Sequence, residues 1–199
     1  MKNKITIRPG DNWHWYFDSK YDCLMLEITS DMIFRSRYPA KMLIPDAFQS
    51  SQFSVDDASA YYQFYESCSA LNLSEPQKVE LVLNAIVANN FLKPQMPKSW
   101  YFIQQPMLFT PAFAEVVEAQ TQDNAERINL LVVEAGSSAS VCLIAQNDVS
   151  MVGKTFNITD VVKVMNDRLV SKNSTLIDNK NDNDDESELL MKLFHQECS

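Results

Sequence analysis

The chain has 199 residues, enough for one full domain or two small ones, and its hydrophobic content of 46% is ample for a packed core. A net charge of −9 argues against a nucleic-acid-binding protein. The longest apolar runs are too short for a membrane span and no leader segment is visible, so we expect a soluble, cytoplasmic protein without membrane insertion.

The first third of the chain predicts an antiparallel sheet. Residues 11–17 alternate large rings on both sides, which is typical of a strand. Residues 23–28 form a second expected strand, with Leu24 and Leu26 on one face, and residues 32–35 form a third. Because only short polar turns separate these segments, we expect a three-stranded meander.

Two helices should follow and cover this sheet. Ser54 is a good N-cap, and Asp56 and Asp57 suit the first turn of a helix that ends near residue 71. Ser74 caps the second helix, with Gln77 at the capping-box position. This second helix is apolar on most sides and is therefore expected at the centre of an α+β domain, residues 1–93. Pro94 ends it, and residues 93–98 read as a stiff linker.

The rest of the chain predicts a small β-barrel-like domain, residues 94–170, with one helix capped by Thr159. Residues 136–138 read as a hairpin turn. Residues 171–199 hold three lysines and seven acidic residues, and we expect this acidic tail to be disordered. The expected strands of the second domain cover residues 100–103, 113–119, 128–134, 141–146 and 151–157.

The sequence offers little for catalysis. None of its three glycines belongs to a phosphate-binding loop, and its two histidines form no metal-binding pair. Four widely separated cysteines are expected as buried free thiols. A hydrolase built on His14 would need a nucleophile and a carboxylate beside it. We therefore predict a non-enzymatic protein that uses no cofactor or metal.

Several long sequence segments closely resemble the ZapC family of bacterial cell-division proteins. The likeness runs in one order from about residue 7 to residue 169. The segments are D-N-W-H-W-Y-F-D (Asp11–Asp18), M-I-F-R-S-R-Y (Met32–Tyr38), K-M-L-I-P-D-A-F (Lys41–Phe48), V-E-L-V-L-N-A-I-V-A (Val79–Ala88), L-K-P-Q-M-P-K-S-W (Leu92–Trp100), I-N-L-L-V-V-E-A-G (Ile128–Gly136) and V-M-N-D-R-L (Val164–Leu169).

The resemblance implies a cytoplasmic protein recruited to mid-cell, where it binds the tubulin-like GTPase FtsZ directly. It further implies lateral bundling of FtsZ protofilaments, lower GTP turnover, and no enzymatic activity of its own. His14 and the acidic tail depart from the family pattern. Whether the protein is a monomer or a weak dimer stays open at this point.

FtsZ is acidic and has an exposed C-terminal tail, so its partner needs local cations for docking and apolar contacts for affinity. The alternative is a small-molecule- or peptide-binding regulator with an aromatic pocket lined by Trp13, Trp15 and the stripe of Tyr61, Tyr62 and Tyr65, although such a stripe is more typical of core packing. The predicted partner-binding residues are Lys93, Lys98, Arg35, Arg37, Lys41, Leu24 and Leu26.

Overall fold

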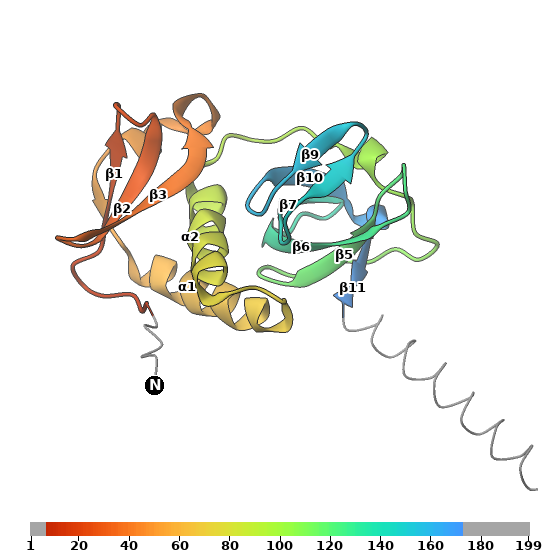
Figure 1. The fold of residues 1–199 in the computed structure, drawn as a ribbon, viewed down its shortest axis with the longest axis horizontal. Coiled ribbons are helices and arrows are strands. Elements are labelled where there is room, and N and C mark those ends of the chain that lie inside the picture. The colour runs from red at the N-terminus through yellow and green to blue at the C-terminus, as the bar shows by residue number, and fades with distance from the viewer. Residues whose placement is uncertain (1–6, 173–199) are drawn as a thin grey trace, which may run out of the picture.

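The computed structural model describes residues 7–172, so the acidic tail predicted over residues 171–199 lies outside the described residues from residue 173 onward. Its first part is an antiparallel sheet of four strands, β1 (His14–Asp18), β2 (Cys23–Thr29), β3 (Met32–Pro39) and β4 (Ser51–Gln52), in the order β3-β2-β1-β4 (Figure 1). The predicted meander is confirmed, and β4 adds a short strand on the far side of β1. Strand β3 therefore forms one edge of this sheet.

Both predicted helices are present. Helix α1 (Val55–Ser67) begins at Ser54, whose Oγ accepts a hydrogen bond from the Asp57 N–H, while the Asp57 carboxylate accepts one from the Ser54 N–H. Helix α2 (Glu75–Phe91) begins at Ser74, whose N–H donates to Gln77 Oε1. Residues 81–88 of α2 are all buried, so the predicted burial of this helix is confirmed.

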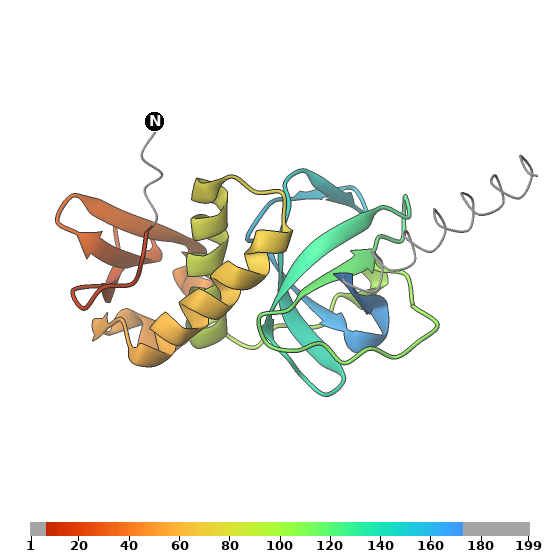
Figure 2. The ribbon, with the colours of Figure 1, turned by 90° about the horizontal axis from the view of Figure 1, so that it is seen from below.

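The second part is an antiparallel sheet of five strands with a small hairpin beside it. The sheet order is β10-β7-β6-β5-β11, and it curves without closing into a barrel (Figure 2). The α+β class is confirmed. The elements are β5 (Val116–Gln120), β6 (Arg127–Glu134), β7 (Ala139–Ile144), β10 (Val161–Met165) and β11 (Leu169–Ser171), with β8 (Val149–Met151) and β9 (Lys154–Phe156) in the hairpin.

The prediction of a helix after Thr159 is wrong. Residues 161–165 form strand β10, a 3₁₀ turn covers Asn166–Arg168, and β11 follows. Val162 and Val164 alternate into the core, and β10 pairs with β7 along its whole length. The β-branched valines suit a strand, and the pairing partner on β7 decides the outcome.

Two shorter expectations also need correction. Residues 100–103 do not form a strand, because a 3₁₀ turn covers Ser99–Tyr101 and its end is bonded back to Lys98 and Ser99. Residues 151–157 form parts of two strands, because Val152 and Gly153 both have positive φ and reverse the chain. The turn at Gly136 is where predicted, and a Cβ there would lie 2.1 Å from the Ala139 carbonyl oxygen.

One hydrophobic core joins the two parts of the chain. It contains α2 together with Leu131 and Val133 of β6 and Leu143 of β7, all buried. The opposite faces of the same strands, including Leu130 and Val132, form a second core. Helix α2 is thus covered by one sheet on each side, as Figure 1 shows.

Buried thiols give the fold a characteristic response to alkaline pH. Burial raises the pKa of the Cys68 and Cys142 thiols from 9.0 to about 12. Below pH 9 both states keep these protons, and at higher pH the unfolded chain releases them first. We expect the free energy of unfolding to fall as pH rises from about 9 to about 12. In Cys142→Ala this fall should be less steep, by up to about 1.4 kcal/mol per pH unit, because one buried thiol is gone. Urea titrations across this range measure both slopes, and equal slopes would contradict the prediction.

Candidate functional site

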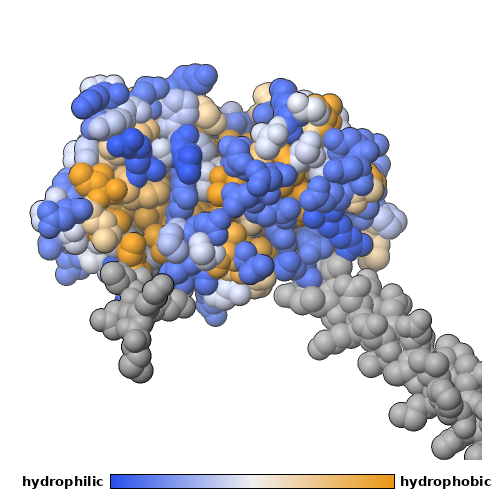
Figure 3. Space-filling view, viewed as in Figure 1, coloured by the Kyte–Doolittle hydropathy of each residue, from blue (hydrophilic) through white to orange (hydrophobic). Residues whose placement is uncertain are grey.

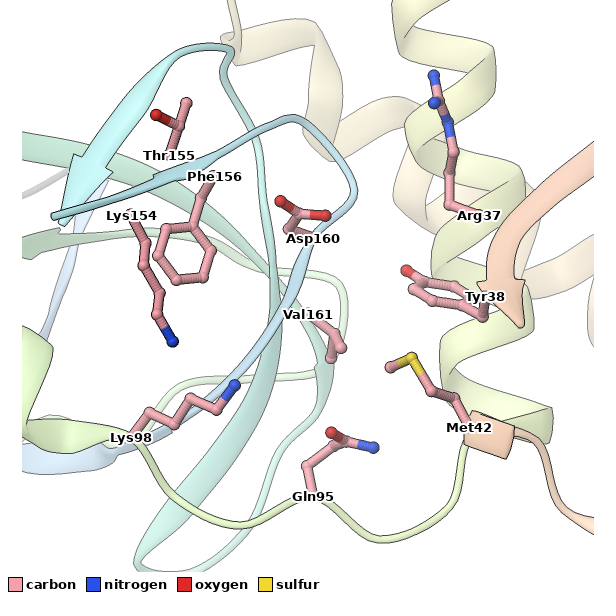
Figure 4. A pocket seen from close by; sticks show the side chains of 10 residues that line it. All are labelled: Arg37, Tyr38, Met42, Gln95, Lys98, Lys154, Thr155, Phe156, Asp160 and Val161. Atoms are coloured by element: carbon pink, nitrogen blue, oxygen red, sulfur yellow. The ribbon is translucent and has the colours of Figure 1, made fainter. Parts of the chain in front are cut away.

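A cleft of about 320 Å³ lies where the two parts of the chain meet (Figure 4). The end of β3, the linker, β9 and β10 all contribute to it, so residues far apart in sequence share one surface. Its charged groups are three cations and one carboxylate. The lining residues are Arg37, Tyr38, Met42, Gln95, Lys98, Lys154, Thr155, Phe156, Asp160 and Val161.

Tyr38 joins the two walls of the cleft. The side chains of β3 alternate, so Arg37 is exposed while Tyr38 is buried. The Tyr38 hydroxyl donates a hydrogen bond of 2.8 Å to the Thr159 carbonyl oxygen. Burial, with a smaller contribution from Asp160, raises the pKa of Tyr38 well above its ordinary value, so the hydroxyl keeps its proton.

Removal of this hydroxyl tests how firmly the walls are joined. Tyr38→Phe leaves the Thr159 carbonyl without its side-chain donor, and we expect the free energy of unfolding to fall by about 1–3 kcal/mol. Tyr62→Phe, at a half-exposed ring, is the matched control and should change it by less than about 0.5 kcal/mol. Urea denaturation of both variants measures the difference. A Tyr38 variant as stable as the control would show that the bond contributes nothing.

The backbone of the linker fixes the position of Lys98. Its N–H donates to the Lys163 carbonyl oxygen at 2.8 Å, and Pro97 forms a bridge to the same residue of β10. One residue later, the Ser99 hydroxyl accepts the Met165 N–H. The linker is therefore attached to the edge of the second sheet along this stretch.

Lys154 enters the cleft from the hairpin. The positive-φ pair Val152 and Gly153 reverses the chain directly before it. Figure 4 shows the ends of Lys98 and Lys154 pointing into the same part of the cleft, with Asp160 on the wall above them. The Asp160 carboxylate accepts the Asn157 N–H at 2.8 Å. Two ammonium groups that converge from different elements favour an anionic ligand or an acidic segment.

Arg37 is held in place by α2. Its Nε lies 2.7 Å from Glu80 Oε1, and its backbone N–H donates to the buried Asn84 side chain at 2.9 Å. Since Glu80 balances the charge of Arg37, the net positive charge of the cleft comes mainly from Lys98 and Lys154.

The other predicted cations lie near this cleft. Lys93 Nζ donates to the Lys41 carbonyl oxygen at 2.9 Å, and the Lys93 N–H donates to the carbonyl oxygen of Met42, which lines the cleft. Arg35 lies farther along β3, with its guanidinium 3.7 Å from the centre of the Tyr21 ring. The structure thus brings four of the five predicted cations to the cleft or its border.

The two residues predicted as apolar contacts do not lie at the surface. Leu24 and Leu26 are both 0% exposed and belong to the core beneath the first sheet. The proposed aromatic pocket is instead filled by ring packing: Trp13, Trp15 and Tyr61 are buried, while Tyr62 is 52% exposed. Trp13 contacts Phe53 edge to face at 5.1 Å, and Tyr61 stacks on Tyr65 at 5.9 Å. These rings pack against one another, as expected of aromatic residues at helical spacing.

Sequence reasoning missed Lys154. The Val152-Gly153 dipeptide before it was the available signal, because a glycine inside a strand pattern often marks a turn. The expectation of one continuous strand over residues 151–157 hid this signal. Even with the turn assigned, only the tertiary structure places Lys154 opposite Lys98.

The described residues provide no metal centre, since no group of three His, Cys, Asp or Glu side chains is arranged to bind an ion within 7–172. His14 lies across the sheet from Glu27, with His14 Nε2 3.5 Å from Glu27 Oε2, and tilted against the Tyr16 ring. No helix in this part of the chain is long and apolar enough to span a membrane.

Comparison with known sequences identifies the family of the chain. The family model described as "Cell-division protein ZapC, N-terminal" matches residues 6–93, and that described as "Cell-division protein ZapC, C-terminal" matches residues 94–175. This chain belongs to the ZapC family of cell-division proteins. The resemblance found in the sequence is thereby confirmed.

Named ZapC relatives match most of this chain. The cell division protein ZapC of Proteus mirabilis is 45% identical over 165 residues, which is 83% of this chain and 90% of the relative. That of Xenorhabdus bovienii is 44% identical over 168 residues, 83% of this chain and 92% of the relative. The ZapC of Vibrio cholerae is 35% identical over 174 residues, 85% of this chain and 94% of the relative. The protein is therefore a cell-division protein.

Proposed function

We propose that this protein is a non-enzymatic FtsZ-binding protein that docks on FtsZ through the cleft at Lys98 and Lys154. It is recruited from the cytoplasm to mid-cell, promotes lateral association of FtsZ protofilaments and lowers their GTP turnover. The observation that carries the proposal is the convergence of two ammonium groups on one cleft in a chain of net charge −9. ZapC family membership supports the cell-division role.

The surroundings of the cleft favour a peptide-like partner. Most of the surface in Figure 3 is hydrophilic, with apolar patches over the N-terminal half and at the junction. Met96 and Trp100, on either side of Lys98 in the chain, are 79% and 64% exposed. Cations next to exposed apolar side chains suit a segment that carries both carboxylates and hydrophobic residues, because charge guides docking and apolar burial adds affinity.

Bundling requires two filament contacts for each cross-link. The cleft is built from residues of both 1–93 and 94–170, the two domains that we propose, so one chain provides one such contact. The second contact has to come from another surface of the same chain or from a second copy in a weak dimer. Sedimentation velocity at the concentrations that bundle filaments distinguishes the two arrangements.

Co-sedimentation with GTP-assembled FtsZ tests the proposed function. We expect this protein to enrich in the pellet at moderate salt, and to do so less as salt rises, because the contact is electrostatic. Full-length FtsZ and FtsZ without its C-terminal tail show which part is bound. The absence of enrichment with full-length FtsZ would refute direct binding.

A further inference from the structure

Strand β3 presents an open edge. Its neighbour β2 pairs with it on one side, and no strand of residues 7–172 pairs with it on the other. Helix α2 reaches only its far end, where Asn84 accepts the Arg37 N–H. The exposed part of the edge includes Met32 and Ile33, which are 39% and 51% exposed. A long edge with apolar side chains is usually protected from other strands, and here the described fold leaves it open.

A groove of about 390 Å³ follows this edge between β3 and α2, lined by Ile33, Arg35, Ser36, Arg37 and Glu80. Two cations and one apolar residue face outward from alternate positions of the strand. Next to them, Ser36 is only 4% exposed, and its hydroxyl has no hydrogen-bond partner within the described part of the chain. The groove thus combines an open strand edge, positive charge and an unsatisfied buried hydroxyl.

We propose that residues 187–192 of this same chain add to the edge of β3 as an antiparallel strand over residues 31–36, short of Arg37, whose N–H is bonded to Asn84. This segment, S-E-L-L-M-K, lies beyond the residue at which the family match ends, 175. With Glu188 opposite Arg35, its Leu190 falls opposite Ile33 and its Lys192 opposite Asp31, which lies in the turn before β3. Opposed residues of paired strands share one face, so these contacts form together.

The opposite face of the added strand matches in the same register. Leu189 falls opposite Phe34, which already packs against the core, and Met191 falls opposite Met32. Ser187 falls opposite Ser36, whose hydroxyl lacks a partner. A shift by one residue would place charged side chains against the core face and leucines against the arginines, so the register is specific.

Chain length allows the contact within one molecule. The described chain leaves the fold near α1, since the Ser171 hydroxyl donates to Glu115 Oε1 and the nearby Phe113 ring contacts Phe64 of α1 at 4.9 Å. The 14 residue-to-residue steps from Lys172 to Glu186 span up to about 46 Å when the chain is extended. Figure 1 shows β3 and β11 on opposite sides of α2, and the extended linker is longer than this helix, which spans about 25 Å.

Cysteine pairs in the full-length chain test the register directly. In a Cys198→Ser background, we expect Ile33→Cys with Leu190→Cys to form an intramolecular disulfide under mild oxidation, because opposed residues lie within disulfide range. Ile33→Cys with Leu189→Cys is the matched control, one residue out of register and on the opposite face. Peptide mapping of the monomer fraction measures both yields. Equal yields, or a cross-link found only in dimers, would overturn the proposal.

A charge exchange provides the second test in the same cysteine background. Arg35→Glu or Glu188→Arg alone should each lower the yield of the 33–190 disulfide by up to about fivefold, because like charges then face each other. Arg35→Glu combined with Glu188→Arg should restore the yield. Arg35 is exposed, so these changes leave the core intact. Failure of the double exchange to restore the yield would refute the pairing, and neither test involves FtsZ.

Discussion

Reversing two charges, Lys98→Glu and Lys154→Glu together, should weaken co-sedimentation with assembled FtsZ by tenfold or more in Kd, a loss of at least about 1.4 kcal/mol. Both ammonium groups point into the cleft, and neither is neutralised by an ion pair among the described residues. After reversal, the cleft lining presents three carboxylates, with Asp160 as the third, to an acidic partner. Like charges brought together at an interface oppose binding strongly.

A control variant with the same change in net charge shows whether weaker binding comes from the cleft itself or from the overall charge of the protein. Lys20→Glu with Lys78→Glu alters residues in the β1–β2 turn and the first turn of α2, and neither lines the cleft. We expect that control to pellet with a Kd within about threefold of the unmodified protein, since charges away from the cleft are screened by salt. If both pairs weaken binding equally, the cleft is not the docking site.

Single reversals locate the site more finely. Lys93→Glu alters the cation that lies beside Lys41 at the border of the cleft, whereas Lys98→Glu alters its interior. A docking site centred on the cleft makes Lys98→Glu the more damaging change. Pelleting of both variants at one salt concentration gives the ranking, and circular dichroism checks that each is folded.

Leu131→Ala should lower the free energy of unfolding by about 2–5 kcal/mol and should do so for the whole chain at once. Leu131 is 0% exposed and belongs to the core that contains α2. Since this core joins the two sheets, tryptophan fluorescence and far-UV circular dichroism should report the same transition. A Trp100→Phe background leaves the buried Trp13 and Trp15 as the fluorescent probes. Urea titration followed by both probes is the measurement.

Leu130, the neighbour of Leu131 in the chain, provides the matched variant. Leu130 is also 0% exposed and lies on the same strand β6, but it faces the second core. If the chain unfolds as one unit, Leu130→Ala lowers the urea midpoint of one transition that both probes report. A Leu130→Ala protein in which the tryptophan signal stays at its original midpoint, while circular dichroism shifts, would show that the two parts unfold independently. Val55→Ala, at an 86% exposed position, should change stability by less than about 0.5 kcal/mol.

The cleft and the β3 edge share Arg37, which lines both. An acidic tail segment on β3 would place carboxylates beside the cations that the sequence singled out for partner binding. The acidic residues beyond the family match therefore offer a way to modulate docking without altering the residues that the family models match. Reversal of Glu186 and Glu188 to lysine tests this, with stronger FtsZ pelleting as the expected result.

Sequence alone determined much of the N-terminal architecture. The strands of the meander follow from alternation and short turns, and both helices follow from their capping residues, Ser54 and Ser74. The central place of α2 follows from apolar residues on most of its sides. These features depend on interactions between residues that are close together in the chain, so they can be predicted from the sequence. The seven sequence segments that resemble the ZapC family span both parts of the chain, and they were also sufficient to indicate the family.

Only the tertiary structure decided the rest. Residues 161–165 carry a pattern that suits a helix face, and pairing with β7 makes them a strand. Leu24 and Leu26 look equally suited to a core or to a contact surface until the helices cover them. Lys98 and Lys154 are far apart in the chain, and they meet only because the linker bonds to β10 and a two-residue turn directs Lys154 back. Long-range pairing fixes such positions, and no local pattern records which partner a strand or a charge will meet.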